Sequence, residues 1–130
     1  MLLDTSFLID LMRGESGAIK TARELESDLV QQRVSAMTLF ELFYGVERSG
    51  QPAAERDAIT SVIESKPIVP ADASVMRKAG RIAGRLANDG TPIDDGDVLI
   101  GATAATLEEP VLTRNVTDFE RIDDVHVESY

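Results

Sequence analysis

The sequence predicts a single α/β domain, in which a parallel sheet of four to five short strands is flanked by helices. Two observations lead to this prediction. Short apolar runs alternate with longer segments whose apolar residues recur every three or four positions, the pattern of strands joined by crossover helices. The 130 residues contain no internal repeat and no linker, so residues 1–130 are expected to form one domain with a buried core.

Five short runs are the candidate strands. They are residues 1–3, 34–36, 67–70, 111–113 and 126–128. Pro67 and Pro70 bound the third run, and proline cannot donate a hydrogen bond to a neighbouring strand. The third strand is therefore expected at an edge of the sheet.

Helices are expected between these runs. The candidate segments are residues 7–12, 17–29, 38–46, 58–63, 75–86 and 98–107. Thr38 is expected to cap the third helix, with Glu41 three residues later at the spacing of a capping box. The last segment is apolar nearly all round and rich in small residues, which predicts a buried, closely packed helix. Residues 114–119 are expected to form a loop with a polar face.

Composition narrows the functional classes. The formal net charge of −10 is concentrated in residues 89–130, and so acidic a protein is a poor general binder of nucleic acid. A polyanionic substrate would therefore need bound metal ions or local arginines. The absence of cysteine excludes disulfides and thiolate metal sites. No apolar segment approaches the roughly 20 residues of a membrane helix. With no signal peptide in the pattern, the expected compartment is the cytoplasm.

Four acidic residues occupy matching positions in successive strand–helix units. Asp4 ends the first strand, and Glu41 follows the second. Asp97 opens the buried helix, and Asp118 follows the fourth strand. Each alone could be a helix cap, a helix-dipole partner or a turn residue. The carboxyl ends of parallel strands share one edge, however, and carboxylates gathered there repel one another unless a cation lies between them. Mg²⁺ or Mn²⁺ would suit oxygen ligands, and phosphodiester hydrolysis would suit such a site.

The segments around these acids resemble the motifs of PIN-domain ribonucleases, specifically the toxins of VapBC-type toxin–antitoxin pairs. The matching segments are residues 3–6, 35–42, 97–104 and 112–119, with Gly101 at a position where alanine is commoner. The resemblance spans essentially the whole chain. It implies a PIN-like three-layer sandwich and an endoribonuclease that depends on Mg²⁺ or Mn²⁺.

The resemblance also implies a role for each acid. Asp4, Glu41, Asp97 and Asp118 would form the catalytic quartet. Asp4 and Asp97 would bind metal directly. Asp118 would bind a second ion or activate water, and Glu41 would hold a coordinating water or act as a base.

Neighbouring residues would support the quartet. Thr5, Ser6 and Asn115 would orient the carboxylates through hydrogen bonds. Asp94 is either an additional acid of the site or the N-cap of the buried helix, and the N-cap role is favoured. For Arg114, a contact with a substrate phosphate and a structural role both remain open.

The implied partners are an RNA substrate, a cognate antitoxin and a second copy of the chain in a homodimer, with DNA contacted only through the antitoxin. An antitoxin of this family lays a segment along an apolar groove. Phe40, Phe43 and Tyr44 are candidates for that surface, although Phe40 and Phe43 could equally belong to the core. Asp10 has no evident partner in the sequence and is expected on the surface.

Other classes of protein fit less well. A Mg²⁺-binding adhesion module needs a hydroxyl residue at position 8, where the chain has Leu8. A phospho-receiver domain needs a lysine near its last strands, and no lysine follows Lys78. An RNA-processing or structure-specific PIN-type nuclease outside a toxin–antitoxin pair shares the carboxylate chemistry and remains the alternative.

Overall fold

The computed structural model describes all 130 residues and contains one five-stranded sheet. The strands are β1 (Leu2–Leu3), β2 (Arg33–Ser35), β3 (Ile68–Val69), β4 (Val111–Leu112) and β5 (Val127–Glu128). Their order across the sheet is β3-β2-β1-β4-β5, and every neighbouring pair is parallel. The predicted parallel sheet is confirmed, and β3 lies at an edge as its flanking prolines predicted.

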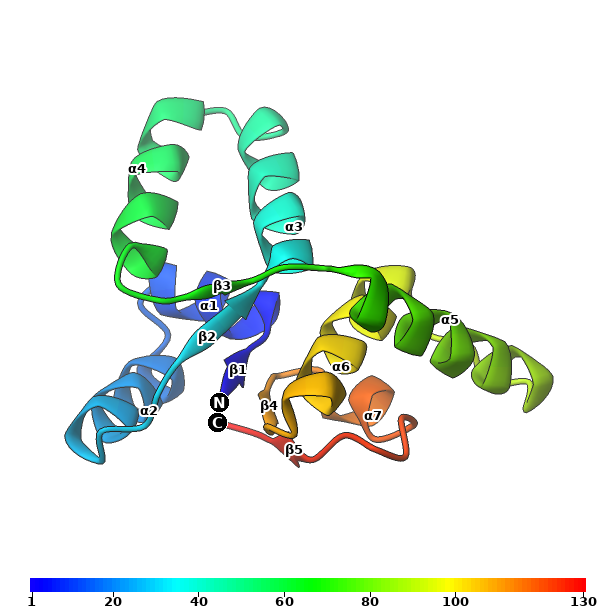
Figure 1. The fold of residues 1–130 in the computed structure, drawn as a ribbon. Helices are drawn as coiled ribbons and strands as arrows, with labels where there is room; N and C mark the ends of the chain where they lie inside the picture. Colours follow the sequence, from blue (N-terminus) through cyan, green and yellow to red (C-terminus); the bar gives the residue numbers. More distant parts are fainter.

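Seven helices connect and cover the strands (Figure 1). They are α1 (Thr5–Met12), α2 (Ser16–Ser27), α3 (Ala36–Glu47), α4 (Pro52–Ile63), α5 (Ala73–Asn88), α6 (Asp95–Leu107) and α7 (Val116–Phe119). Helices α3 and α4 form an antiparallel pair that extends beyond the sheet, and α5 extends away from it in another direction. No helix is both long enough and apolar enough to cross a membrane.

The sheet separates two apolar cores, because successive residues of a strand point to opposite faces. Leu2 and Val111 belong to a cluster with side chains of α5, α6 and α7. Leu3, Val34 and Leu112 belong to the other cluster, with side chains of α1 to α4. The result is a three-layer sandwich with helices on both faces of the sheet.

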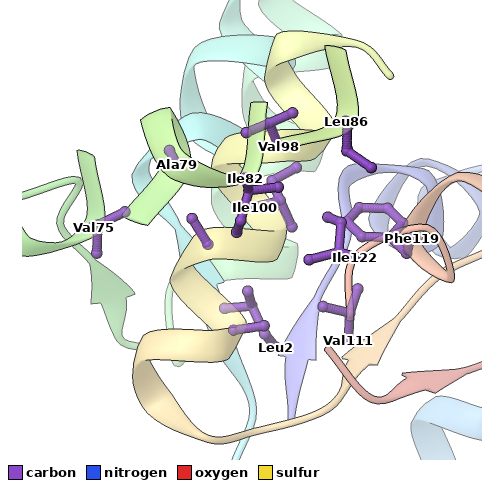
Figure 2. Close-up of a cluster of buried hydrophobic side chains, with 12 residues drawn as sticks. Leu2, Val75, Ala79, Ile82, Leu86, Val98, Ile100, Val111, Phe119 and Ile122 are labelled. Atoms are coloured by element: carbon purple, nitrogen blue, oxygen red, sulfur yellow. The ribbon is translucent and has the colours of Figure 1, made fainter. Parts of the chain in front are cut away.

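Figure 2 shows the first of these cores. Helix α5 contributes a stripe at the predicted helical spacing, formed by Val75, Ala79, Ile82 and Leu86. Helix α6 is buried along most of its length, as its composition predicted. A β-carbon added at Gly101 would lie 2.5 Å from Cδ1 of Ile122, so the absence of a side chain there lets α6 pack closely against the segment after α7.

Two local predictions were wrong. Helix α3 begins at Ala36, and its N-cap is Ser35, whose hydroxyl accepts a hydrogen bond from the Thr38 amide at 3.1 Å. Thr38 is therefore a fully buried residue inside the helix, and Glu41 lies in its second turn. The expected loop after β4 contains a short helix, α7, whose last residue Phe119 is buried. The apolar anchor ties this segment to α6.

Candidate active site

The carboxyl ends of the central strands open into an acidic pocket of about 410 Å³. It is lined by Asp4, Thr5, Ser6, Ile9, Glu41, Asp97, Arg114 and Asn115. These residues come from α1, α3, α6 and the ends of β1 and β4. The structure thus brings three of the four expected acids to one pocket, and Asn115 links the fourth, Asp118, to it.

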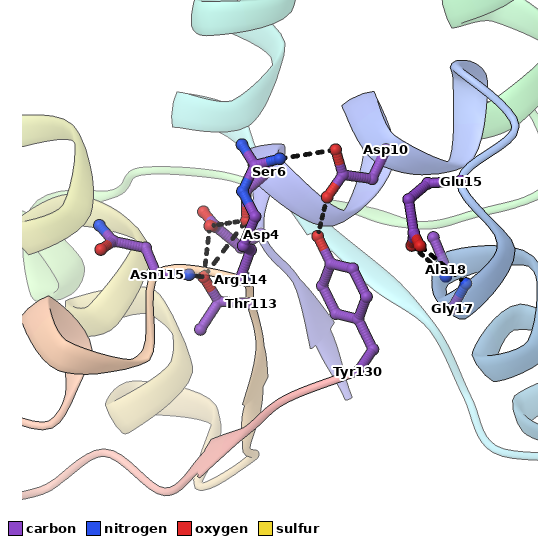
Figure 3. A network of polar contacts seen from close by, with 10 residues as sticks. All are labelled: Asp4, Ser6, Asp10, Glu15, Gly17, Ala18, Thr113, Arg114, Asn115 and Tyr130. Carbon is purple, nitrogen blue, oxygen red and sulfur yellow. Dashed lines mark hydrogen bonds and ion pairs between the residues drawn. The ribbon is translucent and has the colours of Figure 1, made fainter.

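Asp4 is held by two hydroxyl groups at the centre of the sheet edge (Figure 3). Its backbone amide donates to the carbonyl of Leu112 at 2.9 Å, which fixes the residue beside β4. Its Oδ2 accepts hydrogen bonds from Ser6 Oγ and Thr113 Oγ1, both at 2.7 Å. The side chain makes no helix-capping hydrogen bond, and the residue is 3% exposed. One face of this carboxylate is therefore preorganised by the protein.

Glu41 is held by a hydroxyl chain that joins α1 to α3. Thr5 Oγ1 donates to Glu41 Oε1 at 2.7 Å and lies 3.0 Å from Thr38 Oγ1. Burial raises the pKa of Glu41, the Thr5 hydrogen bond lowers it, and the charges of Asp4 and Asp94 raise it further, for a net upward shift. The proton affinity of Glu41 thus depends in part on the Thr5 hydroxyl.

Asn115 bridges the two remaining acids. Its side-chain Nδ2 donates to Asp97 Oδ2 and to Asp118 Oδ2, each at 2.9 Å. Its backbone amide donates to Thr113 Oγ1 at 2.8 Å, so the same residue also supports the hydroxyl that binds Asp4. The supporting position predicted for Asn115 corresponds to this bridge.

The charges of the acids act on one another most strongly at Asp97. Burial, followed by the charges of Asp4, Glu41, Asp94 and Asp118 in decreasing order, together raise the pKa of Asp97 to about 7. A carboxyl group with this pKa holds a proton over much of the acidic range. A nearby cation would remove the proton and relieve the repulsion.

Asp94 lies beside the pocket and only partly fulfils its predicted role. It is the N-cap residue of α6 by position, but its side chain makes no capping hydrogen bond. A β-carbon added at Gly96 would lie 3.3 Å from Asp94 Oδ2 and 2.9 Å from Glu41 Oε2. The lack of a side chain at Gly96 therefore leaves room for two carboxylates, a requirement that the sequence did not reveal.

Asp10 was predicted to lie on the surface, and this prediction was wrong. It is 6% exposed. Its Oδ1 accepts from Arg114 Nη1 at 2.7 Å, and its Oδ2 accepts from the Tyr130 hydroxyl at 2.6 Å (Figure 3). Both partners are more than a hundred residues away in the sequence, so no local pattern could have indicated them.

The donor set suits hard divalent cations. The pocket offers carboxylate oxygens and contains neither histidine nor cysteine. No three acidic or histidine side chains converge closely enough to share one ion. Mg²⁺ usually keeps several waters and takes only one or two carboxylates, so the arrangement fits ions that are each bound by one or two acids and water.

The three aromatic residues of α3 form an exposed patch. Phe40, Phe43 and Tyr44 are 64%, 41% and 58% exposed. The alternative that Phe40 and Phe43 belong to the core is therefore wrong. We refer to these three residues as the aromatic patch.

Comparison with known proteins gives a consistent result. The model of the PIN domain family matches residues 1–125. The chain is 34% identical over 124 residues to ribonuclease VapC19 of Mycobacterium tuberculosis, with 95% of each chain covered. It is 28% identical over 129 residues to the tRNA(fMet)-specific endonuclease VapC of Salmonella typhimurium, which covers 99% of this chain and 96% of that protein.

Solved structures show the same similarity. The DNA-bound VapBC of Salmonella typhimurium superposes with a TM-score of 0.89 at 27% identity, covering 98% of this chain and 96% of that one. VapBC-5 of Mycobacterium tuberculosis, a member of the VapBC family of toxin–antitoxin systems, has a TM-score of 0.68 at 27% identity, covering 98% and 94%.

Proposed function

This chain belongs to the PIN-domain family and is an endoribonuclease of the VapC toxin type, and we propose that it hydrolyses RNA with Mg²⁺ or Mn²⁺ held by Asp4, Asp97 and Asp118. The observation that carries the proposal is the convergence of carboxylates from separate strand–helix units around one pocket. The chain has a formal net charge of −10, so its overall charge opposes the binding of a polyanion such as RNA. Bound cations would supply the missing positive charge.

Bound divalent ions would activate water and stabilise the charge that develops on the leaving oxygen. The side chains of the protein perform the remaining tasks. Ser6 and Thr113 fix the orientation of Asp4, and Asn115 fixes Asp97 relative to Asp118. Glu41, whose pKa is raised, is the candidate to accept the proton of the attacking water.

Arg114 is the candidate contact for a substrate phosphate. Its side chain lies at the wall of the pocket and is 59% exposed. A guanidinium group has five N–H donors, and only one nitrogen, Nη1, is bonded to Asp10. The remaining donors can bind phosphate oxygens in the paired geometry that arginine favours.

The protein partner is an antitoxin of the VapB kind, because the solved neighbours are VapBC assemblies. The aromatic patch supports the proposal that an apolar antitoxin segment packs along α3. A homodimer is proposed as well, with RNA as the substrate of each subunit and DNA contacted only by the antitoxin.

The test is cleavage of single-stranded RNA by the purified chain, free of antitoxin. Cleavage should require Mg²⁺ or Mn²⁺ and stop on addition of EDTA. Asp4→Asn and Asp97→Asn should abolish it, whereas Asp57→Asn, an exposed acid on α4, should leave it unchanged. Normal turnover in either site variant would contradict the assigned site. Cleavage that an antitoxin encoded next to this gene does not inhibit would favour an RNA-processing nuclease.

A further inference from the structure

One nearly buried acid with both of its oxygens hydrogen-bonded lies outside the catalytic quartet. Asp10, in α1, is nearly buried, and each of its two oxygens accepts one side-chain hydrogen bond. A buried carboxylate is stable only when it is paired or well hydrogen-bonded. Here the two donors are Arg114, at the wall of the acidic pocket, and Tyr130, which follows β5.

Tyr130 gives this arrangement a rigid support. Its ring packs edge-on against the fully buried Phe7, with ring centroids 4.9 Å apart and an interplanar angle of 77°. Its hydroxyl lies 2.6 Å from Asp10 Oδ2. Burial, the hydrogen bond to Asp10 and the charge of Asp10 all raise the pKa of Tyr130, so the hydroxyl keeps its proton and remains a donor at physiological pH.

Arg114 is fixed at both ends. Its backbone amide donates to Ser6 Oγ at 3.1 Å, the same hydroxyl that binds Asp4. Its guanidinium is held by Asp10 at 2.7 Å. A free arginine side chain has about 2 kcal/mol of rotamer entropy to lose, so an arginine already held in place binds an anion more tightly than a mobile one.

We propose that Asp10 and Tyr130 are positioning residues that hold the Arg114 guanidinium at the wall of the acidic pocket, where it binds a phosphate of the RNA substrate. The inference rests on the proposed nuclease function and adds to it a phosphate-binding group whose placement depends on α1 and on the segment after β5. Asp10 and Tyr130 act only through Arg114 and do not touch the substrate.

A double-mutant cycle tests this dependence. Tyr130→Phe removes one hydroxyl but keeps the ring against Phe7, and Arg114→Ala removes the proposed phosphate contact. We expect Arg114→Ala to raise KM for RNA about 10-fold and Tyr130→Phe about 3-fold, with smaller changes in kcat, as for loss of one preorganised contact. In the Arg114→Ala background, Tyr130→Phe should have no further effect on KM. Arg23→Ala, an exposed arginine on α2, is the matched control.

The cycle distinguishes positioning from a general structural role. If Tyr130→Phe raised KM equally with and without Arg114, the inference would be wrong. Asp10→Asn should repeat the Tyr130→Phe result, and thermal unfolding of every variant checks that the fold is intact. If the wild-type chain did not cleave RNA, the proposed function would fail. The same variants would then be compared by their affinity for RNA, measured by fluorescence anisotropy. If the chain did not bind RNA, or if the effect of Tyr130→Phe on affinity did not depend on Arg114, the inference would be overturned too.

Discussion

Asn115 and Asp97 are joined by a hydrogen bond of 2.9 Å, from the side-chain amide of one to Oδ2 of the other, and the same amide nitrogen also reaches Asp118. A neutral donor thus lies between two acids that would otherwise repel each other. Residues that orient metal-binding carboxylates in this way set both the affinity and the geometry of a metal site.

Replacing Asn115 by alanine should therefore weaken metal binding. We expect the Mg²⁺ concentration for half-maximal cleavage to rise about 10- to 100-fold, the usual effect of losing a group that orients a ligand. A Mg²⁺ titration of the cleavage rate is the measurement. Asn88→Ala, at the exposed end of α5, should leave the titration unchanged. An unchanged titration in the Asn115 variant would show that the bridge has no part in metal binding.

Asp97 should make stability depend on pH in a particular direction. Its pKa is about 7 in the folded protein and near 4 in an unfolded chain. Between these values the folded state holds a proton that the unfolded state lacks, so stability falls as pH rises from about 4 to 7.

Asp97→Asn should remove this dependence. With EDTA present, the variant should be more stable than wild type at pH 8 by roughly 1–2 kcal/mol, after allowance for solvent screening, and equally stable at pH 4. Urea unfolding at the two pH values is the measurement. A variant that was destabilised at pH 8 would show that burial and repulsion do not act on Asp97 as described.

Thr5 should set the acid limb of the pH–rate profile through Glu41. Its hydroxyl stabilises the ionised carboxylate, so Thr5→Val should raise the pKa of Glu41 and shift the acid limb of kcat/KM to higher pH. Thr5→Ser keeps the hydroxyl and should keep the wild-type profile. The measurement is kcat/KM between about pH 5 and pH 9 at saturating metal. Identical profiles for the valine and serine variants would exclude this role.

Gly96 should not tolerate a larger residue, because of the side chains beside it and not because of its backbone conformation. A methyl group there would approach Glu41 Oε2 to 2.9 Å and displace it. Gly96→Ala should lower kcat about 10-fold or more, because small misplacements of catalytic groups have large effects, while the fold persists. Gly80→Ala is the control, since nothing lies within 4 Å of its position in the exposed part of α5. It should stabilise the protein by about 0.5–1 kcal/mol without changing kcat.

Substitutions in the aromatic patch should weaken partner binding without lowering the stability of the fold. Phe40 is 64% exposed, so Phe40→Ala should change the free energy of unfolding by less than about 0.5 kcal/mol. The same variant should weaken antitoxin binding at least about 10-fold, because exposed aromatic residues are typical binding hot spots. Ile59→Ala, at the buried residue of α4, should instead lower stability by about 2–5 kcal/mol. Unchanged antitoxin affinity for Phe40→Ala, measured by calorimetry, would exclude the patch from that interface.

Much of the site could be predicted because strand ends carry topological information. Asp4 follows an apolar strand, and Asp97 precedes an apolar helix. A parallel sheet places the carboxyl ends of its strands and the N-termini of its crossover helices at the same edge, whatever the conformation of the loops between them. The edge position of β3 followed in the same way from its prolines. For these residues the local sequence pattern and the topology of a parallel sheet lead to the same placement.

The missed features depend on residues far apart in the chain. Thr113 and Asp10 could be identified only from partners more than a hundred positions away. Gly96 looks like any glycine in a turn until two carboxylates are found beside it. The cap of α3 was misassigned because Ser35 and Thr38 are both good N-cap residues and only backbone geometry distinguishes them.

The sheet order has a consequence for a toxin during its synthesis. Strand β1 at the start of the chain pairs on one side with β4, which is made more than a hundred residues later. Asp4 accepts a hydrogen bond from Thr113, and Asp118 is made later still. A ribosome that stops before this point releases a chain with neither a complete sheet nor a complete set of acids. A chain that stops before Asp118 is therefore expected to be unable to cleave RNA.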